Sequence, residues 1–330
     1  MRRTAGRWAR LLGGPAILAV LVWRLGTGPF LDAVAMIDGR SLAAAAAIAV
    51  LTTVCSAWRW SLVARGLGLG LQLRPAVAAY YRSQFLNTTL PGGVVGDVDR
   101  GVRHGRGLGH TSLGLRAVAW ERLAGQVVQI ALAMTVLLLL PSPVRSSMPA
   151  VVIAVAAGAL GLVLLGWALP HAGPSVWART VRTMVADLRG GLRTWRAFTG
   201  IVLASVAVVA GHTVTFLIAA RTAGVTASPV TMLPLALLIM LAMGVPMNIA
   251  GWGPREGAAA WVFGAAGLGE AQGVATAVVF GVMVLVSSLP GAVVLIAARL
   301  HPGAPDRGQA DSPPTWVPSP AELKGGVAGG

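Results

Sequence analysis

Two short segments gather most of the residues whose types and spacing suit binding chemistry. The first reads LNTTLPGGVVGDVDRGVRHGR and joins glycines and a proline to aspartates and arginines. The glycines predict a tight turn with exposed amides, and Asp97 predicts the N-cap of a helix beginning near Val98. The positive end of such a helix attracts anions. The substrate-binding candidates in this segment are Asn87, Pro91, Gly92, Gly93, Gly96, Asp97, Arg100 and Arg103.

The arginines of this segment suggest a phosphate ligand. Arg100 and Arg103 are three residues apart, so they share a helix face and suit bidentate contacts with phosphate oxygens. Asp99 lies four residues before Arg103 and is expected to hold it. An ordinary cytosolic loop with surface ion pairs explains the composition equally well, and both interpretations stay open.

The second segment, NIAGWGPREGAAAWVFGAAGLGE, places a charged pair between apolar runs. Ionisable residues in such a setting are costly and indicate a functional site. Pro254 followed by Glu256 is also ordinary chemistry for a helix start, but this does not explain Arg255 unless an anion meets it. Asp97, Glu121 or a lipid phosphate would supply that anion. The candidates here are Gly251, Gly253, Arg255 and Glu256.

Two tryptophan motifs add further charged positions. WER, at 120–122, contributes Glu121 and Arg122 as binding candidates, with a membrane-interface anchor and local ion pair as the alternative. In WRW, at 58–60, we expect Arg59 to extend its side chain to the headgroup region from the cytosolic end of a span.

The composition dictates what kind of protein must position these residues. Of 330 residues, 55% are hydrophobic and 11% charged, and the mean hydropathy is +0.74, which excludes an ordinary water-facing surface. We therefore predict an all-α polytopic membrane protein with six to eight transmembrane helices, with two pseudo-repeats left open. Apolar runs long enough to span lie at 41–63, 123–140, 151–169, 198–220, 230–247 and 273–298, preceded by a shorter run at 11–23.

Two segments interrupt this pattern of spans. Residues 74–93 and 248–270 are broken by proline and glycine and carry charges, so we predict two re-entrant hairpins around an internal polar cavity. Residues 1–300 form the predicted membrane domain. Residues 301–330, rich in proline and glycine, are predicted to be a disordered tail.

The formal charge of +15 is concentrated in arginine-rich blocks between the spans. This arrangement is typical of topogenic charge and does not suit a nucleic-acid groove. It predicts a cytoplasmic N-terminus, cytosolic positions for 100–116 and 176–196, and an external 141–149 loop. Cys55 is alone and the five histidines are scattered, so we expect no metal site, and no cofactor or catalytic motif is found.

Three motifs together resemble a known family. FLNTTLPGGVVGDVDRGV, AVAWERLAGQ and NIAGWGPREGAA are similar to signature blocks of the lysylphosphatidylglycerol synthase transmembrane-region family, also described as flippase-like. The resemblance covers roughly residues 10 to 300. It implies a membrane domain like that of a lipid flippase. In bifunctional members a soluble aminoacyltransferase domain follows, which we do not expect in this chain, so an enzyme is the less favoured reading.

These considerations predict translocation of an anionic phospholipid or lipid-linked headgroup across a bacterial plasma membrane. In the expected mechanism Arg100, Arg103 and Arg255 neutralise phosphate, and nearby acids hold these arginines when the site is empty. The acids are Asp97, Glu121 and Glu256. The alternatives are a membrane-embedded transferase using a polyprenyl-phosphate donor, or a non-transporting scaffold of an envelope-synthesis complex. A homo-oligomer and an envelope-synthesis partner both stay open.

Overall fold

The computed structural model describes residues 17–147, 158, 161, 183, 184, 186, 187, 194–244 and 252–300. Within these ranges the regular structure is helical, which confirms the predicted all-α class. A short helix, Ile17–Leu25, precedes α2 and the 3₁₀ turn Arg145–Ser147 follows α6. The remaining helices are α2 (Gly28–Ala35), α3 (Gly39–Gly66), α4 (Leu73–Thr89), α5 (Val95–Gly107), α6 (Thr111–Leu139), α9 (Trp195–Thr222), α10 (Pro229–Met243), α11 (Pro254–Ala265), α12 (Glu270–Ser288) and α13 (Pro290–Leu300).

Four helical segments are long and apolar enough to cross a bilayer: α3, α6, α9 and the stretch Glu270–Leu300 formed by α12 and α13. They coincide with four of the predicted runs. The helix Ile17–Leu25 and α2 make a fifth candidate only as a pair bent by 93°, so the N-terminal run is broken and not one straight span. The predicted 151–169 span lies outside the described residues except at two positions, and the total of six to eight stays a prediction.

α10 is a shorter apolar helix within the predicted 230–247 run. At 1.5 Å per residue, a helix of its 15 residues covers about 22 Å, less than the roughly 30 Å of bilayer hydrocarbon. Its described end at Met243 comes just before residues 245–251, which lie outside the described ranges.

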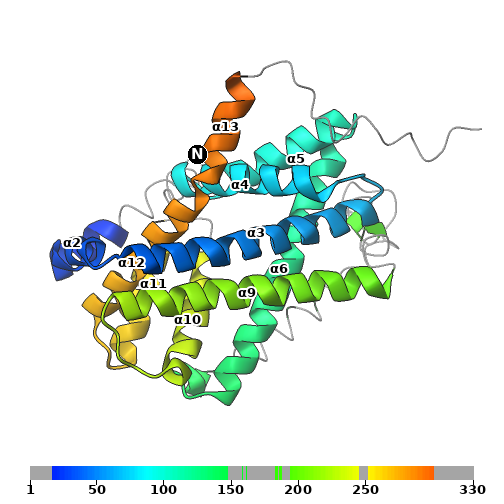
Figure 1. Ribbon diagram of the computed structural model, residues 1–330. Coiled ribbons are helices and arrows are strands. Elements are labelled where there is room, and N and C mark those ends of the chain that lie inside the picture. The colour runs from blue at the N-terminus through cyan, green and yellow to red at the C-terminus, as the bar shows by residue number, and fades with distance from the viewer. Residues whose placement is uncertain are drawn as a thin grey trace, which may run out of the picture.

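The long helices form the frame of the molecule. α3 lies alongside α9, and α6 crosses both at a steep angle (Figure 1). One hydrophobic core joins α9, α10, α11 and α12, and a second surrounds Trp60 between α3, α4 and α6. Large apolar side chains remain exposed on the outer faces, including Leu51, Val127 and Leu203, as expected for surfaces in contact with lipid.

The first predicted hairpin, 74–93, is the single helix α4 followed by a glycine turn, and the returning helix α5 lies beyond the predicted range. Gly92 and Gly93 have φ of 94° and 61°, a conformation that glycine adopts without steric cost, so the predicted turn is confirmed there. Gly96 has another role: it lies in α5, where a Cβ would overlap the backbone carbonyl of Ser83. α5 begins at Val95, three residues earlier than predicted, so Asp97 occupies the first turn and is not the N-cap.

The second predicted hairpin contains α11, which packs between α10 and α12. Its start follows the predicted chemistry: Gly253 has φ of 113°, Pro254 opens the helix, and the Glu256 carboxylate accepts the Gly253 N–H at 2.6 Å. Gly251 lies outside the described residues.

The start of α3 has a side-chain cap. The Asp38 carboxylate accepts the backbone N–H of Ser41 at 2.6 Å, and this bond to the charged form lowers the pKa of Asp38 below its ordinary value.

Candidate functional site

Five charged side chains from three helices form a cluster beside the first hairpin. They are Arg59 of α3, Asp97 and Arg100 of α5, and Glu121 and Arg122 of α6, and we call them the charge cluster. Four of them are at least 90% buried, whereas 51% of the Arg122 side chain is exposed. Burial of this many charges is tolerated only when they pair with one another.

Glu121 is the centre of the cluster and is fully buried. Its Oε1 accepts hydrogen bonds from Arg59 Nε at 2.8 Å and from the Tyr80 hydroxyl at 3.2 Å. Its Oε2 accepts from Arg100 Nη2 at 2.6 Å. Arg59 Nη1 donates onward to Ser205 Oγ of α9 at 3.1 Å. One carboxylate therefore ties together α3, α4, α5 and α6.

Asp97 anchors the glycine turn to the same cluster. It accepts hydrogen bonds from Arg100 Nε at 3.1 Å, Ser83 Oγ at 3.2 Å and Asn87 Nδ2 at 2.9 Å, and its Oδ2 pairs with Arg122. The Asn87 carbonyl oxygen in turn accepts the backbone N–H of Gly96 at 2.8 Å. Asn87 therefore fastens the start of α5 to α4 through both ends of its amide.

Aromatic rings stabilise Arg100. Its Cζ lies 4.3 Å from the ring centroid of Tyr80 and 4.7 Å from that of Trp60, distances typical of cation–π contacts. Its Nη1 is buried and has no hydrogen-bond partner among the residues that the structure describes. Because the cluster holds three arginines and two carboxylates, it carries one positive charge in excess, and Arg122 is its exposed cation.

A cavity of about 750 Å³ adjoins the cluster, and we call it the polar cavity. Its wall is shared by α3, α4, α6, α9, α10, α12 and the glycine turn. Thr52, Gln126 and Val208 line it near the middle of α3, α6 and α9, so it lies at about half the depth of these spans. The other polar or site residues in its wall are Ser56, Arg59, Tyr80, Gln84, Asn87, Thr88, Gly92, Gly93, Arg122, Gln129, His212, Thr215, Ser287 and Ser288.

Arg255 and Glu256 form a separate buried pair at the start of α11. Arg255 Nε and Nη2 donate to Glu256 Oε1 at 2.8 and 2.5 Å. The Arg255 Cζ lies 5.0 Å from the ring centroid of Trp252 and 5.7 Å from that of Phe280. The anion that meets Arg255 is thus its neighbour Glu256. No contact within the described ranges joins it to Asp97, and neither member of the pair lines the polar cavity.

The predicted site residues divide into groups in the structure. Those that meet at the charge cluster or in the wall of the polar cavity are Asn87, Gly92, Gly93, Asp97, Arg100, Glu121 and Arg122. Pro91 is exposed at the turn and Gly96 is a packing position. Gly253, Arg255 and Glu256 belong to the separate pair.

Three expected pairings or placements are wrong. Arg103 is exposed while Arg100 is buried, so the two side chains do not bind one ligand together. A step of three residues turns the helix by about 60° from a full turn, which here places Arg100 against neighbouring helices and Arg103 toward solvent. Asp99 pairs with Arg82 of α4, Nε to Oδ2 at 3.0 Å, and not with Arg103. Arg59 is 6% exposed and does not extend to the headgroup region, since Glu121 holds it inside.

Several residues of the polar cavity were not predicted from the sequence, although two groups of them recur at helical spacing on α3 and α6. Thr52, Ser56 and Arg59 are four and three residues apart and form one polar stripe on α3. On α6, Gln126 and Gln129 follow the predicted Arg122 at the same four- and three-residue spacing. Polar residues recurring at helical spacing within apolar spans indicate a shared inner face. Tyr80 and His212 in the cavity wall, and Ser205, which accepts a hydrogen bond from Arg59, gave no comparable signal.

A match to one protein family decides the membership of the chain. The model of the lysylphosphatidylglycerol synthase TM region matches residues 9–291. The chain belongs to this family. No curated protein and no solved structure matches the chain. Together with the apolar helices, membership shows a multi-pass membrane protein connected with lipid metabolism or transport.

Proposed function

We propose that this protein moves an anionic, phosphate-bearing lipid headgroup from one leaflet to the other through the polar cavity. The observation that carries the proposal is the Arg122 guanidinium, half exposed in the cavity wall beside a cluster with one positive charge in excess. Asp97 pairs with this arginine in the structure, but the two carboxylates of the cluster leave one of its three positive charges unmatched. An unmatched charge in the membrane region is costly, and a phosphate would neutralise it.

The geometry suggests how the headgroup would be bound and released. Arg122 pairs with Asp97 Oδ2, and the Asp97 carboxylate keeps three other donors if Arg122 turns away. A phosphate can therefore replace Asp97 as the partner of Arg122 without leaving a buried carboxylate unpaired. Arginine suits this exchange because its planar guanidinium forms paired hydrogen bonds with phosphate oxygens.

We place the protein in the plasma membrane with the N-terminus and the arginine-rich blocks in the cytoplasm, following the positive-inside rule. The substrate is a membrane lipid, either an anionic phospholipid or a lipid-linked phosphate. The glutamines and hydroxyl groups of the cavity wall offer further hydrogen bonds to a polar headgroup.

Transbilayer exchange of a fluorescent phosphatidylglycerol in proteoliposomes tests the proposal. Substitution Arg122→Gln should slow exchange about tenfold or more, the effect of one lost charge-assisted hydrogen bond to phosphate. Arg196→Gln is the matched control, because Arg196 is an exposed arginine at the start of α9 that does not line the cavity.

Equal exchange rates for the two variants and the wild type would contradict the proposal. Accumulation of a new covalent lipid product from a supplied polyprenyl-phosphate donor, without exchange, would replace it with the transferase alternative. Both variants should first be shown to elute from size exclusion as the wild type does, so that misfolding is not read as lost transport.

A further inference from the structure

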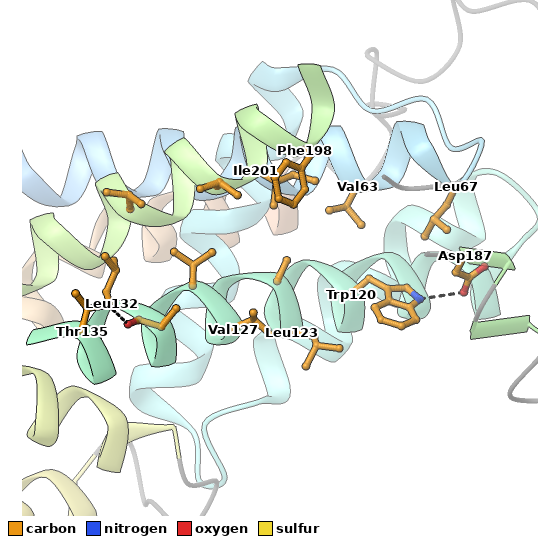
Figure 2. Close-up of a pocket in the computed structure, with 15 residues that line it drawn as sticks. Val63, Leu67, Trp120, Leu123, Val127, Leu132, Thr135, Asp187, Phe198 and Ile201 are labelled. Carbon is orange, nitrogen blue, oxygen red and sulfur yellow. Dashed lines mark hydrogen bonds between the residues drawn. The ribbon is translucent and has the colours of Figure 1, made fainter. Parts of the chain in front are cut away.

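A second cavity, of about 530 Å³, lies next to the polar cavity and differs from it in chemistry. Its wall is apolar except for residues at its ends. It is formed by α6 from Trp120 to Thr135 and α9 from Phe198 to Val206, together with Val63 of α3, Leu67 just after α3, and Asp187. We call it the α6–α9 groove. Figure 2 shows Phe198 and Ile201 across the groove from α6, with Trp120 and Asp187 at one end and Leu132 and Thr135 at the other.

The length of the groove suits a hydrocarbon chain. The helical rise from Trp120 to Thr135, the α6 residues at its two ends, is about 22 Å. This is comparable to the roughly 15 Å of hydrocarbon in one leaflet, half of the ~30 Å bilayer core. Leu123 and Val127 in its wall are 50% and 57% exposed, which leaves it open to lipid along α6.

One end of the groove is closed by an ionic contact. Arg116 Nε and Trp120 Nε1 donate to Asp187 Oδ2 at 2.7 and 3.0 Å. A hydrocarbon tail that reached past Asp187 would displace its hydrogen-bond donors and leave charged groups without partners, which is unfavourable. The route to a polar environment runs elsewhere: Leu123 lines both the groove and the polar cavity, and it directly follows Arg122.

We propose that the α6–α9 groove binds the hydrocarbon tail of the transported lipid while its phosphate meets Arg122 in the polar cavity. The identity of the headgroup rests on the proposed function, whereas the tail site rests on the apolar wall and its continuity with the cavity at Leu123. The tail stays in hydrocarbon contact along α6 while the headgroup crosses, so only the polar part of the lipid needs the interior of the protein.

Photolabelling in nanodiscs tests this site directly. The probes are phosphatidylglycerol and phosphatidylcholine that carry a photoreactive diazirine on one tail, each added at trace level to phosphatidylcholine nanodiscs. Mapped by mass spectrometry, adducts from the anionic probe should exceed those from the zwitterionic probe about tenfold at 123–135 and 198–206, and Arg122→Gln should remove this excess.

A groove-filling variant supplies the second measurement. Ala131 lines the groove and is exposed, so Ala131→Phe should occupy the tail site without disturbing the core and should reduce anionic-probe adducts in the groove severalfold. Leu203→Phe is the control, since Leu203 is 59% exposed on α9 and does not line the groove.

Equal labelling by both probes would overturn the link between the tail site and Arg122, and unchanged labelling in Ala131→Phe would overturn the tail site itself. Cross-links between groove residues and 151–169 of the same chain would also overturn it, because a protein segment would then fill the groove. Selective labelling in a protein that fails to exchange lipid would sustain the tail site and reject transport. Exchange that is slowed by Arg122→Gln but not by Ala131→Phe would sustain transport and reject the tail site.

Discussion

Glu121→Gln offers the sharpest test of the charge cluster, since it removes one charge and keeps the shape of the side chain. The wild-type carboxylate is fully buried and accepts hydrogen bonds from Arg59, Arg100 and Tyr80. Its loss raises the excess charge of the cluster from one to two positive charges. The amide N–H₂ of glutamine also brings donors toward guanidinium groups that themselves only donate.

The expected cost is large for a single isosteric change. Removing one partner of a buried ion pair destabilises a protein by about 3 to 5 kcal/mol, because the other charge remains buried and unpaired. Glu270→Gln is the matched control: its pair with Arg24 is 3.4 Å long with both side chains well exposed, and such pairs contribute about 1 kcal/mol or less. We therefore expect Glu121→Gln to be clearly less stable than Glu270→Gln.

The assay is the half-life of the monodisperse fraction in mild detergent at a series of temperatures, which does not require reversible unfolding. A double-mutant cycle then isolates the pair: Arg59→Gln combined with Glu121→Gln should cost less than the sum of the single changes, with a coupling of about 0.5 to 3 kcal/mol. Equal stability of Glu121→Gln and Glu270→Gln, or strict additivity in the cycle, would refute the assignment of Glu121 as the centre of the cluster.

Two further changes test other parts of the structure. Gly281→Ala should destabilise the protein by about 1 to 3 kcal/mol, because a Cβ there would overlap the Arg255 guanidinium. Gly39→Ala is the control, since a Cβ at Gly39 meets no atoms. Half-lives in detergent compare the two variants, and equal half-lives would contradict the packing of Arg255 against Gly281. Asp38→Asn should reduce the loss of stability that the wild-type protein shows as the pH is lowered. Because the pKa of Asp38 is lower in the folded than in the unfolded protein, the wild-type cap stabilises the fold above the unfolded-state pKa, and this stabilisation is lost as the pH falls through the folded-state pKa. If wild type and Asp38→Asn lost stability equally as the pH was lowered, the hydrogen bond to Ser41 would contribute nothing.

The fold class and the residue types of the site were predictable because they follow from the solvent. A bilayer requires long apolar helices whose backbone groups are paired internally, so the runs that became α3, α6 and α9 were visible in the hydropathy alone. Gly92 and Gly93 predicted the turn because few other residues adopt its conformation at low cost. Both are local constraints that a sequence carries at a single position or within a single segment.

The partners of the charges depended on the tertiary structure. Glu121 pairs with Arg59 and Arg100 and not with its neighbour Arg122, whereas Glu256 does pair with its neighbour Arg255. Spacing along one helix shows which residues share a face, but the rotation and depth of that helix against its neighbours decide what the face meets. The sequence by itself therefore determined that charges lie within the membrane region, and helix packing determined which of them are neutralised and left Arg122 in the cavity wall.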